Sequence, residues 1–163
     1  MHASILRRSQ VIVALSFCLF ATSAAFGQSP LDAAKQTWVK SSAKAFQESR
    51  ATGRPVVVFV GTNWCHFCKM MENQTWSHPT IDQSIRQSFV GLKLDGDRDQ
   101  QIVSQLGLGG YPATLVYAPD RKLIAKKEGF MAPTDTQQWL GQAQQKYQSK
   151  TLTRTALNRS QPR

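Results

Sequence analysis

The stretch Thr62–Met71, with sequence TNWCHFCKMM, brings together side chains that can carry out sulfur chemistry. Cys65 and Cys68 are separated by two residues, His66 lies between them, and Trp64 precedes them. A cysteine pair with this spacing can exchange electrons as a dithiol and disulfide, bind a metal ion, attach a haem or form a structural disulfide. The compartment and the surrounding elements decide between these chemistries.

The N-terminus has the features of a secretory signal peptide. Arg7 and Arg8 precede the apolar stretch 11–21, and small residues suited to cleavage follow at 25–27. The apolar stretch is shorter than the about 20 residues that a membrane-spanning helix needs. We therefore predict a signal peptide over residues 1–27, a periplasmic or secreted mature protein, and no integral membrane span after signal removal.

The size and charge of the chain limit its partners. Without its first 27 residues, the 163-residue chain is long enough for one domain with a buried core. The formal net charge of +10 favours acidic partners, anionic membrane surfaces or nucleic acid. Export argues against nucleic acid, and the lysines and arginines are scattered, as is typical of a solvated surface. We expect a monomer without a nucleic-acid partner.

The rest of the chain predicts alternating helices and strands. A capping box at 29–32 and a stop signal at 53–55 predict a first helix. The apolar run 56–60, VVVFV, predicts a strand that is buried on both faces. Further predicted elements are helices at 65–74, 81–89 and 98–106, a strand at 89–94, a hairpin of 113–118 with 122–130, and a helix at 134–147.

This order of elements predicts an α/β fold with a central mixed β-sheet flanked by helices. The domain spans residues 28–149. Residues 150–163 contain no acidic side chain and no clear pattern, so we predict a disordered basic tail there.

The two cysteines follow the buried strand directly and open the next helix. The free N–H groups and the positive partial charge of a helix N-terminus stabilise a thiolate. Such a position lowers a thiol pKa from about 8.5 to roughly 3.5–7.5. Cys65, at the helix start, is therefore predicted to attack, and Cys68, one turn later, to resolve the resulting adduct.

At these residues the sequence resembles the thioredoxin-like superfamily, over roughly residues 31–147. The buried strand runs into Trp64–Lys69, with sequence WCHFCK, and Gly110–Thr114, with sequence GYPAT, precedes a later strand. The second motif is similar to the cis-proline loop of the superfamily. By this motif the sequence resembles exported or membrane-tethered thioredoxin-like domains with a WCxxCK sequence.

The resemblance implies a three-layer thioredoxin-like fold and a Cys65–Cys68 disulfide. It also implies that the loop at Tyr111 and Pro112 lies beside the cysteines, has a cis peptide bond and pairs its backbone with a substrate. We take Trp64 and Phe67 as further substrate contacts, Trp64 as a lid and Phe67 as an apolar platform.

The sequence departs from thioredoxin proper behind the cysteines. Phe59 stands where thioredoxin has a buried aspartate, and Gly91 stands where it has the lysine partner of that aspartate. Water, His66 or Glu72 would have to take over proton transfer. His66, when charged, would stabilise the thiolate and favour an oxidising couple; the other interpretation is an ordinary loop histidine.

The resemblance implies an enzyme, a thiol–disulfide oxidoreductase that acts on protein thiols or disulfides. It needs no cofactor or metal, only a redox partner that resets the cysteine pair, and its direction (oxidase, reductase or isomerase) is not assigned. An alternative is a copper-binding or copper-delivery protein using Cys65 and Cys68 with His66 or His78 and a methionine. A purely structural disulfide is disfavoured because the closed loop is too short to stabilise much.

Overall fold

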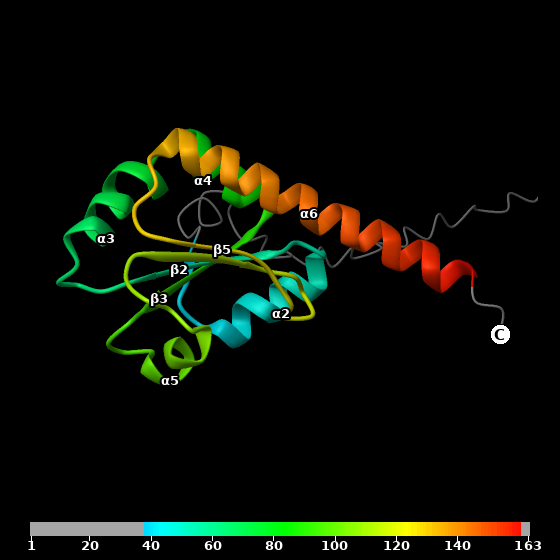
Figure 1. Cartoon of the computed structure of the whole chain (residues 1–163), viewed down its shortest axis with the longest axis horizontal. Coiled ribbons are helices and arrows are strands. Elements are labelled where there is room, and N and C mark those ends of the chain that lie inside the picture. Colours follow the sequence, from blue (N-terminus) through cyan, green and yellow to red (C-terminus); the bar gives the residue numbers. More distant parts are fainter. Residues whose placement is uncertain (1–37, 161–163) are drawn as a thin grey trace, which may run out of the picture.

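The computed structural model describes residues 38–160 as five strands and the helices that surround them (Figure 1). The predicted signal peptide and the capping box at 29–32 lie outside these residues. The elements are β1 (Trp38–Val39), α2 (Ser42–Thr52), β2 (Val56–Gly61), α3 (His66–Met70), the π-helix η1 (Met71–Trp76), α4 (Pro79–Ser88), β3 (Val90–Asp95), α5 (Gln100–Val103), the 3-10 helix η2 (Ser104–Leu106), β4 (Ala113–Tyr117), β5 (Leu123–Glu128) and α6 (Pro133–Ser160).

The strands form one mixed sheet in the order β1-β3-β2-β4-β5. β3 pairs in parallel with β1 and β2, whereas β4 is antiparallel to both β2 and β5. Helices α2 and α5 cover one face of the sheet, and α4 and α6 cover the other (Figure 1). The predicted three-layer fold with a central mixed sheet is therefore confirmed.

Strand β2 lies at the centre of this sheet and is buried along all six of its residues. Successive side chains of a strand point to opposite faces. Val57 and Phe59 accordingly belong to the core under α4 and α6, and Val56, Val58 and Val60 belong to the core under α2 and α5. Its continuous apolar sequence is thus explained by helices on both sides.

The predicted first helix is wrong at its centre, where Trp38 and Val39 form the edge strand β1. Trp38 is opposite Gly91 of β3, and its ring makes edge contacts with Phe59 at 6.4 Å and Trp76 at 5.0 Å. Aromatic packing in the core outweighs the helical spacing of this segment. Helix α2 begins only after its N-cap, Ser41.

The prediction of a disordered tail is also wrong, because helix α6 continues to Ser160. Neither glycine nor proline occurs between Gly141 and Pro162, so no residue breaks the helix after Tyr147. The Tyr147 hydroxyl donates to the carbonyl of Gly53 at 2.7 Å. Arg154 donates to Asp120 at 3.1 Å, which attaches the extended helix to the β4–β5 turn.

The core under α4 and α6 generates a stability prediction. Phe59 is 1% exposed and packs between Trp38 and Trp76, so Phe59→Ala should lower the free energy of unfolding by about 3–5 kcal/mol. Phe67 is 55% exposed, and Phe67→Ala should change the free energy of unfolding by no more than about 0.5 kcal/mol. Denaturant unfolding of both variants measures the difference, and equal losses would contradict the described core.

Candidate active site

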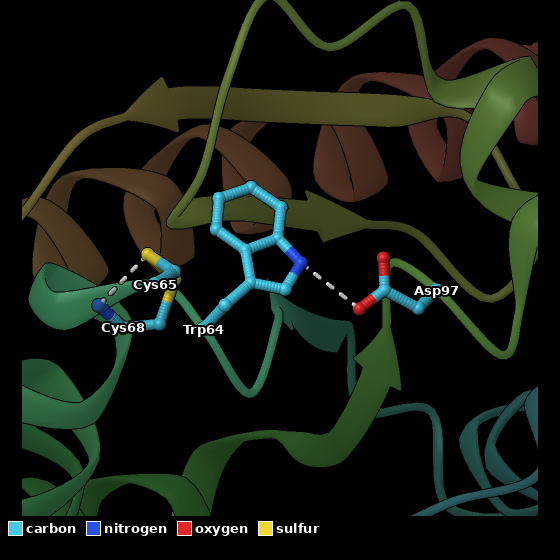
Figure 2. Close-up of a disulfide and its surroundings, with 4 residues drawn as sticks. All are labelled: Trp64, Cys65, Cys68 and Asp97. Carbon is cyan, nitrogen blue, oxygen red and sulfur yellow. Dashed lines mark hydrogen bonds between the residues drawn. A yellow bond between two sulfur atoms is a disulfide. The ribbon is translucent and has the colours of Figure 1, made fainter.

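The two cysteines lie where β2 passes into α3, and they form a disulfide with a Cα–Cα distance of 5.2 Å (Figure 2). Cys65 is the N-cap of α3, and its Sγ accepts the backbone N–H of Cys68 at 3.1 Å. Cys65 is 7% exposed, whereas Cys68 is fully buried. Cys65 is therefore the less buried cysteine of the pair.

The backbone around Cys65 fixes the direction of its side chain. The Cys65 N–H donates to the carbonyl of Thr62 at 3.3 Å, and the Cys65 carbonyl accepts from Lys69 at 3.2 Å. These bonds hold Cys65 in the extended conformation of an N-cap, from which its Sγ faces the free N–H groups of the first turn. The predicted stabilisation of a Cys65 thiolate by these N–H groups stays a prediction.

Trp64 lies immediately beside the disulfide and is 69% exposed. Its Nε1 donates to the carboxylate of Asp97 at 3.1 Å, and its ring meets the edge of Tyr111 at 6.1 Å. Figure 2 shows the indole between the cysteines and Asp97. Phe67 exposes 55% of its surface as well. Two exposed aromatic side chains thus adjoin the disulfide.

His66, between the two cysteines, is exposed to solvent. Its ring makes an edge contact with the ring of Phe67, with the centroids 5.6 Å apart. The predicted influence of His66 on the thiolate of Cys65 stays a prediction.

The Tyr111–Pro112 peptide bond is cis, as the resemblance implies. Pro112 is buried, and its carbonyl accepts the N–H of Gly129 at 2.8 Å. The Tyr111 side chain packs on Gly96, where an added Cβ would lie 2.6 Å from both the ring Cζ and the hydroxyl oxygen of Tyr111. Gly96 therefore leaves the space in which Tyr111 comes close to Trp64.

Asp97 and Gly96 are site residues that sequence reasoning missed. They belong to the loop after β3, with sequence DGDRD at 95–99. The Asp99 carboxylate accepts the N–H of Asp95 at 2.8 Å, and the Asp95 carboxylate accepts the N–H of Asp97 at 2.9 Å. The position of this loop in the sequence could have indicated it. β2 and β3 are parallel, so the loop after β3 lies at the same edge of the sheet as the cysteines after β2.

The strand pairing places a lysine opposite Phe59, the position where thioredoxin has its buried aspartate. Gly91 pairs with Val57, and Lys93 pairs with Phe59. The Lys93 ammonium forms an ion pair of 2.6 Å with Glu72. Both side chains line an open cavity of about 230 Å³ together with Trp38, Phe59, Trp76 and Ser77. The role of Glu72 in proton transfer stays a prediction.

Residues 38–160 bear on two further possibilities, a metal site and a membrane span. No three side chains of His, Cys, Asp and Glu lie close enough there to share a metal ion. Within the same range, every helix is too short or too polar to cross a membrane. The copper alternative stays a prediction.

A model of the thioredoxin-like family matches residues 37–119, half of the chain. The protein therefore belongs to the thioredoxin-like family. The match contains both cysteines, both exposed aromatic side chains and the cis-proline loop.

Solved structures agree in fold. The chain superposes on a thioredoxin from Thermus thermophilus with a TM-score of 0.57 at 19% identity, covering 66% of this chain and 84% of that one. The oxidised C-terminal domain of DsbD from Neisseria meningitidis gives 0.56 at 23% identity, covering 62% and 90%. The DsbH oxidoreductase gives 0.57 at 17% identity, covering 75% and 91%. At these identities the likeness concerns the fold.

Curated relatives are much longer than the matched region. An uncharacterized protein from Caenorhabditis elegans is 26% identical over 112 residues, which is 64% of this chain and 15% of that protein. The thiol:disulfide interchange protein DsbD from Ralstonia nicotianae is 31% identical over 77 residues, which is 45% of this chain and 13% of that protein. The chain therefore corresponds to a small part of each.

The Trp64–Asp97 hydrogen bond generates a second prediction. Asp97→Ala removes the acceptor of the indole N–H, so that proton should exchange with solvent faster than in the unmodified protein. Asp97→Asn retains an oxygen at the same place and should preserve part of the protection. Hydrogen exchange of the Trp64 indole, followed by NMR, measures both. Equal exchange in all three proteins would contradict the role of Asp97.

Proposed function

We propose that this protein is an exported thiol–disulfide oxidoreductase that acts on protein substrates through Cys65 and Cys68. The observation that carries the proposal is the unequal environment of the two sulfurs. Cys65 caps α3, accepts the N–H of Cys68 and is partly accessible, whereas Cys68 is fully buried behind it. Membership of the thioredoxin-like family supports the same assignment.

In the reducing direction, the thiolate of Cys65 attacks one sulfur of a substrate disulfide. A mixed disulfide forms, and the other substrate sulfur leaves as a thiolate. The thiolate of Cys68 then attacks the Cys65 sulfur, which releases the second substrate thiolate and forms the Cys65–Cys68 disulfide. The substrate has gained two electrons, and the cysteine pair has lost them.

In the oxidising direction the same steps run backwards. A substrate thiolate attacks the Cys65 sulfur, Cys68 leaves as a thiolate, and a second substrate thiol displaces Cys65. The exposed rings of Trp64 and Phe67 offer apolar contact area to either substrate form. A second redox protein has to restore the starting state of the pair in both directions.

Export rests on the predicted signal peptide at residues 1–27. A periplasmic or extracellular location would suit the proposed chemistry, because disulfides persist in oxidising compartments. In name, the relative from Ralstonia nicotianae is a thiol:disulfide interchange protein. We propose the same type of reaction for this chain. The substrates and partners of that relative are not part of the proposal.

The proposed order of attack predicts different behaviour of the two cysteine variants. Cys68→Ser should leave attack by Cys65 intact but prevent resolution, so mixed disulfides with substrate proteins should accumulate. Cys65→Ser should trap almost none, because the remaining thiol is fully buried. Non-reducing gels of cells that express each variant measure the adducts. Equal trapping by both variants, or by neither, would contradict the redox assignment and favour the copper alternative.

His66 carries a separate prediction about the redox couple. If its charge stabilises the thiolate, His66→Ala should give less thiolate at a given pH and make the couple more reducing. His78→Ala provides a matched control, since His78 is also an exposed histidine but caps α4. Thiolate absorbance measured against pH distinguishes the His66 variant from the His78 control. Coincident titrations of the His66 variant and the unmodified protein would leave His66 an ordinary loop residue.

A further inference from the structure

The cis-proline loop is preceded by the glycine-rich segment Gly107–Gly110, with sequence GLGG. Glycine has more backbone freedom than any other residue, so this segment has a high entropic cost of ordering. An added Cβ at Gly110 would meet no atom within 4 Å, so packing does not explain the glycine there. Because Tyr111 follows directly, the order of this segment affects the place of the Tyr111 backbone.

Strand β5 contacts the glycine segment through two charged side chains. The Lys126 ammonium donates to the carbonyl of Gly107 at 2.8 Å. The Glu128 carboxylate accepts the N–H of Gly109 at 3.1 Å. Lys126 and Glu128 are two residues apart on one strand, so both side chains lie on the same face. They also form an ion pair with each other at 3.1 Å.

The charges of this pair match the backbone groups that they meet. A cation faces a carbonyl oxygen, and an anion faces an N–H group, which are the strong combinations for hydrogen bonds to charged groups. The hydrogen bond from Lys126, supplemented by the N–H of Gly109, lowers the pKa of Glu128 below its ordinary value. Glu128 is therefore ionised at neutral pH. The bond from Gly129 to Pro112 ties the next part of the loop to the end of β5.

We propose that Lys126 and Glu128 are positioning residues that order the segment Gly107–Gly110 and so hold the Tyr111 backbone ready to pair with an extended protein substrate. This inference rests on the proposed function. It also assigns a substrate preference to the loop: a polypeptide that pairs along Tyr111 should depend on the two charges, and a small disulfide without a peptide backbone should not.

The first test compares two substrates. Glu128→Ala and Lys126→Met should each raise the KM for the reduction of insulin by about two- to fivefold, the range expected for a partly exposed charged contact. The kcat for insulin and the rate with dithiobis(nitrobenzoate), a small aromatic disulfide, should stay the same. Asp120→Ala is the matched control, because Asp120 lies in the same hairpin and its ion pairs are with Lys122 and Arg154. An unchanged KM in both loop variants would overturn the proposal.

A charge swap separates this role from simple stabilisation of β5. The double variant Lys126→Glu with Glu128→Lys restores the ion pair but presents a carboxylate to the Gly107 carbonyl and an ammonium to the Gly109 N–H. The proposal expects the raised KM to persist in the swap. Recovery of the normal KM would show that only the ion pair matters, and would overturn the positioning role.

Hydrogen exchange tests the positioning role without any turnover. The Gly109 amide should exchange faster in Glu128→Ala and in the swap than in the unmodified protein and the Asp120→Ala control. Unaltered exchange would overturn the proposal whatever the kinetics show. Absence of insulin reduction by the unmodified protein, together with altered exchange, would count against the reducing direction of the proposed function and leave the contact between β5 and the loop established.

Discussion

The complete burial of β2 determines where the two cysteines lie. Helices cover both faces of this strand, so none of its side chains is exposed. Residues that follow β2 in sequence can reach the surface only beyond the end of the strand. At that end, an added Cβ on Gly61 would lie 3.2 Å from both Cys68 and the ring of Phe59. The first turn of α3 is thus packed directly against the strand. This contact buries Cys68 completely, and the same turn brings the Cys68 N–H to the sulfur of Cys65, which keeps 7% of its surface exposed.

Segments from three other parts of the chain complete the site. The loop after β3 contributes Asp97, which binds Trp64, and Gly96, which makes room for Tyr111. Strand β5 lies at the far edge of the sheet, yet its charged side chains reach the glycine segment before Tyr111. The disulfide itself is formed within one helical turn. Its surroundings depend on the tertiary fold.

Elements with a strong local pattern could be predicted from the sequence. The run VVVFV predicts β2 because only a strand covered on both faces has no polar alternation, and the Pro119–Arg121 turn predicts the hairpin of β4 and β5. β1 could not be predicted, because two residues carry no periodicity and their place depends on ring contacts with distant side chains. Asp97, Lys126 and Glu128 were missed for a similar reason: each acts on a backbone or side-chain group far away in sequence.

The reduction potential of the Cys65–Cys68 couple tests most directly whether this pair is a redox centre. Purified protein is equilibrated with glutathione buffers of graded ratio, trapped by acid and alkylation, and quantified by mass. The account predicts a two-electron transition between about −120 and −270 mV, the range of known exchange proteins. A pair that stays oxidised below about −300 mV, as structural disulfides do, would contradict it.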